Sequence, residues 1–404
     1  PLFLFVLGLL NAITPTVSYL NGSNQRYLIA HQVRQGFWLV LTMSIPLILI
    51  FCNSHLILDY MHTPESFSSK SQQYLMIMAI GIVPALLAIN LRCMNDGLSN
   101  PKPAMIITFF GLLLNIPLNY IFIFGKFGLP EMGSVGCGVA TAIVNWVMFL
   151  MMFYYCYTNK SQRDIGLFSK WMEMPSGQTL LKICKLGLPI GFATFTEVML
   201  FSTSALFLSP LGAQVVASHQ AALQTSSLFF MIPMSFSIAT TIVIGQTLGQ
   251  KRLDDAKVLS YHALLTGFMF ACLAAVVIVL LDKYIPLAFT RDPLSISIAA
   301  NLLLFAAVYQ ITDALQAVAN GVLRGYKYTQ PILYVTIFCY CVVGMPLGYI
   351  LARTELIVEP MAAQGFWLTF CISLSFASGL LIWQIRKIQK VPHEVLIQKL
   401  ERIK

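Results

Sequence analysis

Eleven long apolar segments, separated by short polar stretches, divide this chain. Each is long enough for an α-helix to cross the ~30 Å apolar core of a bilayer. The alternating ten-residue strands of a membrane β-barrel do not appear. The pattern therefore predicts an all-α polytopic membrane protein. The predicted helices are 1–20, 36–59, 73–95, 103–125, 137–158, 183–208, 221–246, 259–282, 295–320, 331–352 and 362–385.

Composition supports a membrane setting. Hydrophobic residues make up 57% of the chain, charged residues only 10%, and the mean hydropathy is +0.76. Soluble domains carry about 25% charged residues. A water-soluble fold could not bury this much apolar surface, so we expect the lipid bilayer to be the protein's main surrounding.

The formal net charge of +9 is distributed unevenly. When successive loops are assigned to alternate sides of the membrane, 20 of the 25 Lys and Arg residues fall on one side. Loops rich in Lys and Arg stay in the cytoplasm. The charge therefore predicts a cytoplasmic C-terminus, and it gives no reason to expect a nucleic-acid partner.

No recognisable enzyme motif is present. We find no phosphate-binding loop, no dinucleotide fingerprint and no zinc-protease motif, and the histidines and cysteines lack metal-ligand spacing. The sequence thus predicts neither an enzyme nor a bound cofactor.

Short matches suggest that the two halves are repeats. "NIPLNYI" (115–121) resembles "GMPLGYI" (344–350), and Gly22 and Arg92 match Gly249 and Arg324 at similar offsets of 227 to 232 residues. Many membrane transporters are built from such repeats. The offset pairs the first five helices with the last five, so 183–208 lacks a partner, which would precede Pro1.

We therefore expect two six-helix bundles related by a pseudo-two-fold axis, with five and six helices in this sequence. The expected parts are an N-terminal bundle (1–158), a cytoplasmic linker (159–182), a C-terminal bundle (183–385) and a basic cytoplasmic tail (386–404). After Pro392 the tail can form an amphipathic helix that lays Val395, Leu396, Leu400 and Ile403 on lipid, or a solvated helix.

Two carboxylates lie deep inside apolar segments, Glu197 and Asp313. An ionised Asp near the centre of a membrane helix costs about 2.5–3.5 kcal/mol, and such residues commonly mark ion or substrate paths. In "LLLFAAVYQITDAL" (302–315), Tyr309 and Asp313 are four residues apart on one helix face, which Gln316 and Asn320 extend. The alternative is a hydrogen-bonded carboxyl that only joins helices.

No basic residue within the apolar runs is placed to neutralise both acids. They therefore favour an external cation, either Na⁺, H⁺ or a charged organic molecule. Ligands that compete for the same oxygens shift the protein between states through their different affinities. Such competition is the physical basis of antiport.

Asn115 and Asn119 form a second polar pair, with Pro117 between them. Proline frees a backbone carbonyl, and carbonyl and amide oxygens are good ligands for a hard cation. Asn pairs also bond neighbouring membrane helices, so both interpretations stay open.

Four long stretches resemble the multidrug and toxic compound extrusion (MATE) family, specifically its NorM branch: "LLLNIPLNYIFIFGKFGLPEMGSVGCGVATAIV", "LLLFAAVYQITDALQAVANGVLRGYK", "GMPLGYILARTELIVEPMAAQGFW" and "SPLGAQVVASHQAALQTSSLFFMIPMS". The resemblance covers essentially the whole chain. It implies two bundles in a V, a bacterial inner-membrane location, and export of cationic drugs in exchange for Na⁺ or H⁺.

The resemblance also implies roles for single residues. Glu197 resembles the family's essential carboxylate of the seventh helix, and Tyr309 and Asp313 resemble its cation-binding pair. Asn115 and Asn119 look like amides of a second cation site, whose first-helix Asp this sequence lacks.

From the residues and the resemblance together we expect a monomeric multidrug antiporter with a Na⁺ site at Glu197, Tyr309 and Asp313, and a substrate cavity that includes Gln316. Two alternatives remain: a lipid-linked precursor flippase of related fold, and a truncated membrane protein that does not transport.

Overall fold

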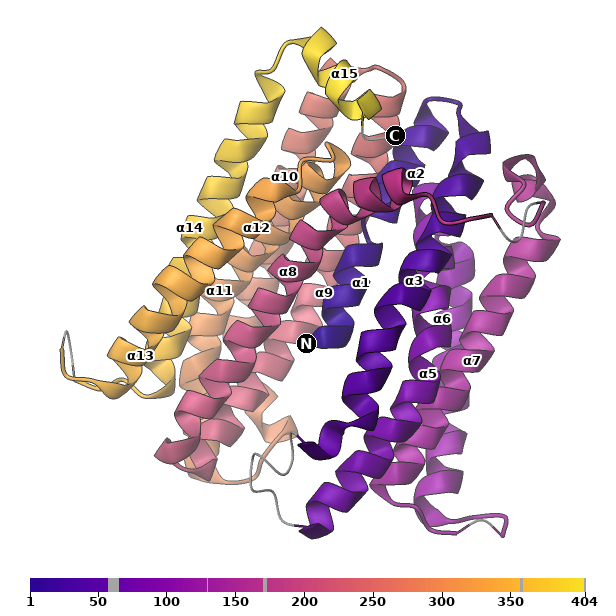
Figure 1. Ribbon diagram of the computed structural model, residues 1–404. Coiled ribbons are helices and arrows are strands. Elements are labelled where there is room, and N and C mark those ends of the chain that lie inside the picture. Colours follow the sequence, from indigo (N-terminus) through magenta and orange to yellow (C-terminus); the bar gives the residue numbers. More distant parts are fainter. Residues whose placement is uncertain (57–64, 129, 170–172, 357–358, 403–404) are drawn as a thin grey trace. The chain divides into compact units, whose positions relative to one another are not determined.

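The structure is a computed structural model that describes residues 1–56, 65–128, 130–169, 173–356 and 359–402. Within these ranges the regular secondary structure is helical (Figure 1). Eleven helical stretches of the described chain are long and apolar enough to cross a membrane. The predicted all-α polytopic architecture is therefore confirmed.

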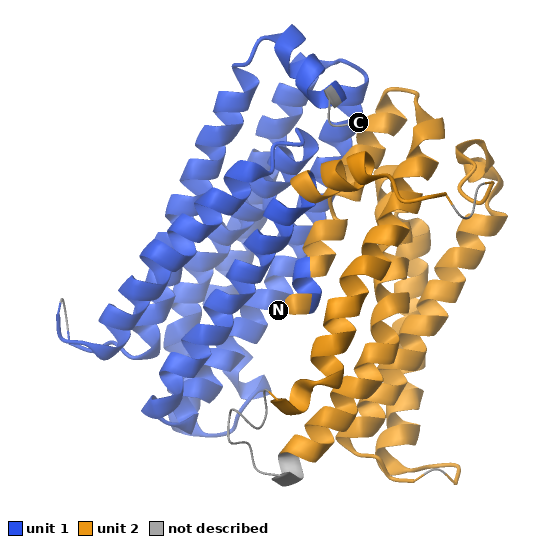
Figure 2. Ribbon diagram, in the orientation of Figure 1, with its two compact units in different colours: residues 1, 3–5, 186–404 blue, residues 2, 6–185 orange. Residues whose placement is uncertain are grey.

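The chain divides into two compact units, shown in Figure 2. In chain order, we call the orange unit, residues 2 and 6–185, the first unit, and the blue unit, residues 1, 3–5 and 186–404, the second unit. The first helix is α1 (Leu2–Leu10). The first unit continues with α2 (Ile13–Gly22), η1 (Arg26–Leu28), α3 (Ile29–Cys52), α5 (Glu65–Gly97), α6 (Lys102–Phe124), α7 (Ser134–Thr158) and η2 (Lys160–Ile165).

The second unit takes up helix α8 (Gly177–Leu208) from residue 186 onward. Its other helices are η3 (Ser209–Leu211), α9 (Ala213–Gly249), α10 (Leu253–Leu280), η4 (Ile285–Ala288), α11 (Pro293–Gly325), α12 (Gln330–Thr336), η5 (Ile337–Gly344), α13 (Met345–Arg353), α14 (Ala363–Gln389) and α15 (His393–Arg402).

Both units pack their helices in the same order. In the first unit α5 lies against α2, α3 and α7, while α6 packs on α7. In the second unit α11 lies against α9, α10 and α14, while α13 packs on α14. The helices correspond one to one in sequence order, which agrees with the repeat seen in the sequence. Helix α11, which carries Asp313, is thus the central helix of its unit.

Small and hydroxyl residues bring α9 and α11 close together. A side chain at Gly321 would collide with the backbone oxygen of Ser237. The hydroxyl of Thr241 donates to the carbonyl of Gly321 at 2.9 Å. In lipid the hydrophobic effect does not drive helices together, so close packing of small residues and interhelical hydrogen bonds stabilise their association.

Two predicted helices are interrupted. Segment 1–20 consists of α1 and α2, which a turn at Asn11 separates. Pro15 lies in the first turn of α2, where its missing N–H costs nothing. Segment 331–352 consists of α12, the π-helical η5 and α13, and Pro346 again occupies a helix start.

Several helices are longer than their apolar runs. Helix α3 begins at Ile29, seven residues before the predicted start, while 57–59 of that prediction lie outside the described residues. The added turns carry polar side chains, including His31 and Arg34, that bond to other protein groups. Hydropathy alone therefore underestimates helix length wherever polar residues find partners.

The tail after Pro392 is helical, as both alternatives predicted. Leu396 and Leu400 are each 2% exposed, so they pack on protein, and the expectation that they lie on lipid is wrong. Lys399 adds a cation–π contact with Tyr328, 5.3 Å from the ring centre. Val395 is exposed, and the side chain of Ile403 lies outside the described residues.

Candidate functional site

Tyr309 and Asp313 lie in the middle of α11 and are buried, with 5% and 3% exposure. They are one helical turn apart, and the phenol is within hydrogen-bonding reach of the carboxyl. The sequence predicted this pairing from their spacing. It sets a carboxyl and an oxygen ligand side by side within a membrane-spanning helix.

Glu197 comes from the middle of α8 and is half-buried. It is close enough to Asp313 and Tyr309 for the charges to interact. The structure therefore brings together the three residues that the sequence predicted for a cation site. Two carboxylates and a phenol, from α8 and α11, share one region of the second unit.

Arg324 changes the electrostatics of this region. The predicted helix 295–320 leaves Arg324 in a loop, but α11 extends to Gly325 and carries Arg324 in its last turn. The half-buried guanidinium interacts electrostatically with Glu197. Its position continues the helical face of Asp313 and Asn320. Glu197 therefore has a basic partner at a helix end, which lies beyond the apolar run predicted for 295–320.

Gln316 is buried, and both its polar atoms are hydrogen-bonded. Its amide donates to the hydroxyl of Tyr340 at 2.5 Å and accepts from the same hydroxyl at 2.8 Å. Tyr340 belongs to the π-helical segment η5, and π-turns are frequent at functional sites. Sequence reasoning missed Tyr340 because an aromatic residue in an apolar run looks like ordinary core.

Aromatic rings enclose the phenol of Tyr309. Its ring centre lies 5.6 Å from Trp367, 6.3 Å from Phe201 and 6.4 Å from Phe370. These rings come from α8 and α14. They exclude water from one side of the acidic region, and they strengthen the interaction between charges there.

His219 holds Trp367 in place. The indole N–H of Trp367 donates to Nδ1 of His219 at 3.1 Å, and Nε2 of His219 lies 3.3 Å from the hydroxyl of Ser204. Because an indole N–H can only donate, Nδ1 must carry no proton. The hydroxyl of Ser204 itself donates to the carbonyl of Phe201, so it accepts from Nε2. His219 is thus neutral with its proton on Nε2.

Asn115 and Asn119 lie on α6 of the first unit. The amide of Asn119 donates to Oδ1 of Asn115 at 2.7 Å, while Oδ1 of Asn119 is buried with no partner among the described residues. The two amides therefore bond within one helix. Their predicted role in a second cation site stays a prediction.

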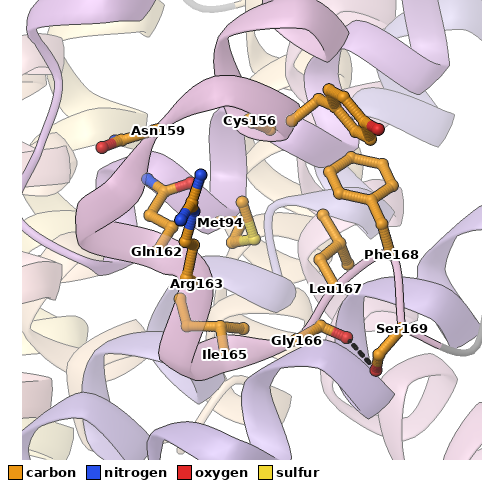
Figure 3. Close-up of a pocket in the computed structure, with 11 residues that line it drawn as sticks. Met94, Cys156, Asn159, Gln162, Arg163, Ile165, Gly166, Leu167, Phe168 and Ser169 are labelled. Carbon is orange, nitrogen blue, oxygen red and sulfur yellow. Dashed lines mark hydrogen bonds between the residues drawn. The ribbon is translucent and has the colours of Figure 1, made fainter.

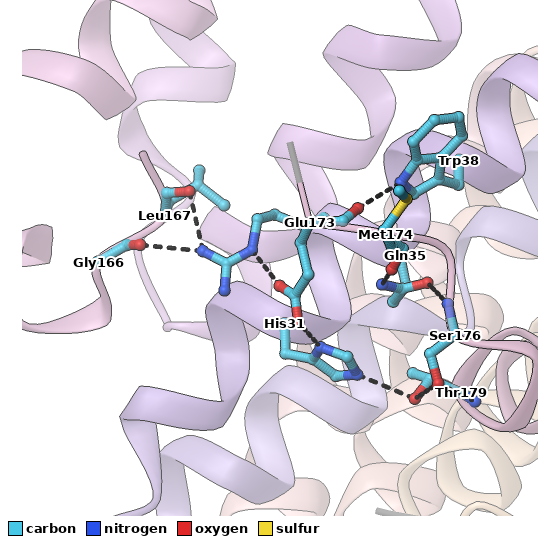
Figure 4. A network of polar contacts seen from close by, with 10 residues as sticks. His31, Gln35, Trp38, Gly166, Leu167, Glu173, Met174, Ser176 and Thr179 are labelled. Atoms are coloured by element: carbon cyan, nitrogen blue, oxygen red, sulfur yellow. Dashed lines mark hydrogen bonds and ion pairs between the residues drawn. The ribbon is translucent and has the colours of Figure 1, made fainter. Parts of the chain in front are cut away.

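The chain that follows η2 is fastened to α3 (Figure 4). Glu173 accepts from Nε of Arg34 at 2.5 Å and lies 2.6 Å from Nδ1 of His31. Arg34 also donates to the carbonyls of Gly166 and Leu167, each at 3.1 Å. Partial burial alone would raise the pKa of the Glu173 carboxyl, but the hydrogen bonds from His31 and Arg34 outweigh it and lower the pKa.

A cavity of about 220 Å³ opens beside this segment (Figure 3). Cys156, Tyr157, Arg163, Leu167 and Phe168 are among its lining residues. None of the predicted site residues contributes to it, so it is unrelated to the acidic region.

Comparison with known proteins identifies the family. The MatE family profile matches residues 1–121 and 189–350. "Probable multidrug resistance protein NorM" of Haemophilus ducreyi is 77% identical over 404 residues, which are the whole of this chain and 87% of that protein. "Multidrug resistance protein MdtK" of Yersinia enterocolitica is 46% identical over 99% of this chain and 87% of that protein.

Solved structures show the same fold. The eukaryotic MATE transporter AtDTX14 superposes with a TM-score of 0.89 at 19% identity, over 100% of this chain and 87% of that chain. MATE in complex with MaD3S gives a TM-score of 0.83 at 18% identity, over 99% and 86%. The present chain is a multi-span membrane protein, and the MatE family consists of membrane transporters rather than enzymes. The chain belongs to the MatE family.

Proposed function

We propose that this chain is a multidrug efflux antiporter that exports cationic or amphipathic drugs in exchange for Na⁺ or H⁺. Two relatives that it matches over nearly its whole length are named as multidrug resistance proteins. The single observation that carries the cation coupling is the burial of Asp313 beside Tyr309, within interaction distance of Glu197.

The burial of Asp313 gives the site its affinity for cations. A carboxylate taken out of water needs a compensating charge or hydrogen bonds, because its desolvation is costly. A cation from outside supplies that compensation, as does a proton on either acid. Na⁺, H⁺ and a cationic drug thus compete for the same oxygens, and each favours the conformation that binds it best.

Arg324 sets the net charge of the site. With Glu197 and Asp313 both ionised and the guanidinium permanently charged, the three groups sum to one negative charge. One monovalent cation neutralises that charge, whereas a second would leave an excess positive charge in low dielectric. This favours a single coupling ion at the acids of the second unit per cycle.

The charge distribution gives the orientation that we propose. The side with 20 of the 25 basic residues, including the C-terminus, faces the cytoplasm of a bacterial inner membrane. The coupling ion then enters from the outside, and drugs are collected from the cytoplasm. We propose that the chain transports as a monomer.

The test is drug efflux from proteoliposomes under an imposed Na⁺ or pH gradient. Asp313→Asn keeps the size of the side chain but removes its charge, so we expect gradient-driven efflux to fall to the level of empty liposomes. Asp254→Asn is the matched control. Asp254 lies at the exposed start of α10, so its neutralisation should leave gradient-driven efflux unchanged.

Two outcomes would contradict the proposal. Equal efflux by the wild type with and without either gradient would refute cation coupling. Full gradient-driven efflux by the Asp313→Asn variant would refute the assignment of the site.

A further inference from the structure

Gln310 is buried in the middle of α11 without a partner. It is 0% exposed, and neither Oε1 nor Nε2 has a hydrogen-bond partner among the residues that the structure describes. Gln316, six residues further along the same helix, makes two hydrogen bonds with Tyr340. Within the described ranges Asn320, also on α11, lacks a partner at Oδ1 only, whereas Gln310 lacks one at both polar atoms.

An unpaired buried amide is energetically unfavourable. Each polar group left without a hydrogen bond costs about 1–3 kcal/mol, whereas an apolar side chain of the same shape carries no such cost. Because Leu would fill this position at lower energy, stability of the present structure does not explain a glutamine here. A bound ligand that engages the amide would explain it.

The amide lies next to the acidic region. Residues three apart on a helix are neighbours on its surface, so Gln310 and Asp313 have Cβ atoms about 5–6 Å apart. Ala306, Ala314 and Ala317 are buried on the same side of α11 and offer no polar side-chain atoms. The carboxyl of Asp313 is therefore the nearest ionisable group on α11 with which Gln310 could share a ligand.

Helix α9 has a proline at the level of Gln310. The hydroxyls of Ser218 and Ser237 donate to the carbonyls of Ser295 and Ala317, which are 77 and 80 residues later. This register sets residue 310 opposite 230–233. Pro233 lies inside α9 and has no N–H, so the carbonyl four residues before it lacks its helical donor.

We propose that Gln310 is a further ligand of the coupling cation, to which Oε1 supplies a neutral oxygen beside the carboxylates of Asp313 and Glu197. A neutral ligand adds affinity without altering the net charge of the site. Amide and carboxylate oxygens are ligands that suit hard cations. The inference rests on the proposed cation coupling, and it favours a metal cation over a proton, because a carboxylic proton needs no third oxygen.

Equilibrium binding of radiolabelled Na⁺ to the purified full chain tests this inference. Gln310→Leu removes both polar atoms at similar volume, and we expect the apparent dissociation constant for Na⁺ to rise roughly ten- to hundredfold. Gln310→Glu keeps an oxygen at the same place and should retain binding. Gln389→Leu is the matched control, because Gln389 is also buried with an unpaired Oε1 but lies at the far end of α14.

Thermal unfolding without Na⁺ separates a ligand from a structural residue. If the amide is unpaired, Gln310→Leu should unfold at the same temperature as the wild type or higher. A lower unfolding temperature, or unchanged Na⁺ affinity, would overturn the inference and leave the proposed antiport intact. Wild-type protein that takes up protons but no Na⁺ would overturn it too, and wild-type protein that binds neither ion would overturn both.

Discussion

At the scale of single residues, charge and hydrogen bonding decide what the acidic region can do. In the site that we propose, Asp313 and Glu197 attract the coupling cation, Arg324 opposes it, and Tyr309 and Gln310 are neutral. The guanidinium cannot lose its proton in a protein. In the proposed cycle, Arg324 therefore weakens cation binding at all accessible pH values and keeps the bound ion exchangeable.

Removing this opposing charge should tighten ion binding. With Arg324→Gln the site carries two negative charges, and at an effective dielectric constant near 20 a charge several ångströms away is worth about 1–2 kcal/mol. We expect the apparent dissociation constant for Na⁺ to fall about tenfold. Arg324→Lys preserves the charge and should bind like the wild type. Weaker or unchanged binding by Arg324→Gln would show that the guanidinium does not act on the site through its charge.

At the scale of elements, the segment after η2 is fastened to α3 by ionic hydrogen bonds. Glu173 accepts from Arg34 and pairs with His31, while His31 also lies 2.9 Å from the hydroxyl of Thr179 near the start of α8. Thr179 belongs to the helix that later carries Glu197. The order of this polar segment therefore fixes where α8 begins.

Neutralising Glu173 should loosen this segment. In Glu173→Gln we expect faster hydrogen–deuterium exchange of residues 173–179, while Glu131→Gln, in an exposed loop, should have no effect. Since the folded-state pKa of Glu173 is lowered from 4.5, its stabilisation is complete at neutral pH and is lost as the pH falls through that lowered value. The difference in hydrogen–deuterium exchange between variant and wild type should therefore persist from about pH 8 to pH 5 and vanish in stronger acid. A difference that grows towards acid pH is incompatible with this account.

At the scale of the whole molecule, hydropathy and spacing were sufficient for the architecture. Apolar segments identified the eleven spanning stretches, and the cost of a charge in lipid singled out Glu197 and Asp313. Tyr340 and Trp367 escaped notice because aromatic residues in apolar runs are usually core. Arg324 was missed because helices continue past their apolar runs, and the isolation of Gln310 could be seen only once its neighbours were placed.

The orientation in the membrane can be tested on intact cells. The proposed topology predicts that green fluorescent protein fused after Lys404 is fluorescent, while alkaline phosphatase fused there is inactive. A phosphatase fusion between α10 and α11, near Asp282, should be active, because that loop belongs to the side with few basic residues. Active phosphatase at the C-terminus would show that the orientation in the membrane, and with it the direction of transport, is opposite to the one proposed.

The π-helical segment η5 has a consequence for how mutations in its helix are interpreted. A π-turn accommodates one residue more than an α-turn, so side chains after Gly344 are rotated by one position from where a regular helix would set them. The helical arithmetic that correctly groups Tyr309, Asp313 and Gln316 on α11 breaks down between α12 and α13. The results of a substitution scan across 330–353 must therefore be fitted with one helical periodicity before η5 and another after it. A single periodicity would assign lipid-facing positions to the interior of the bundle.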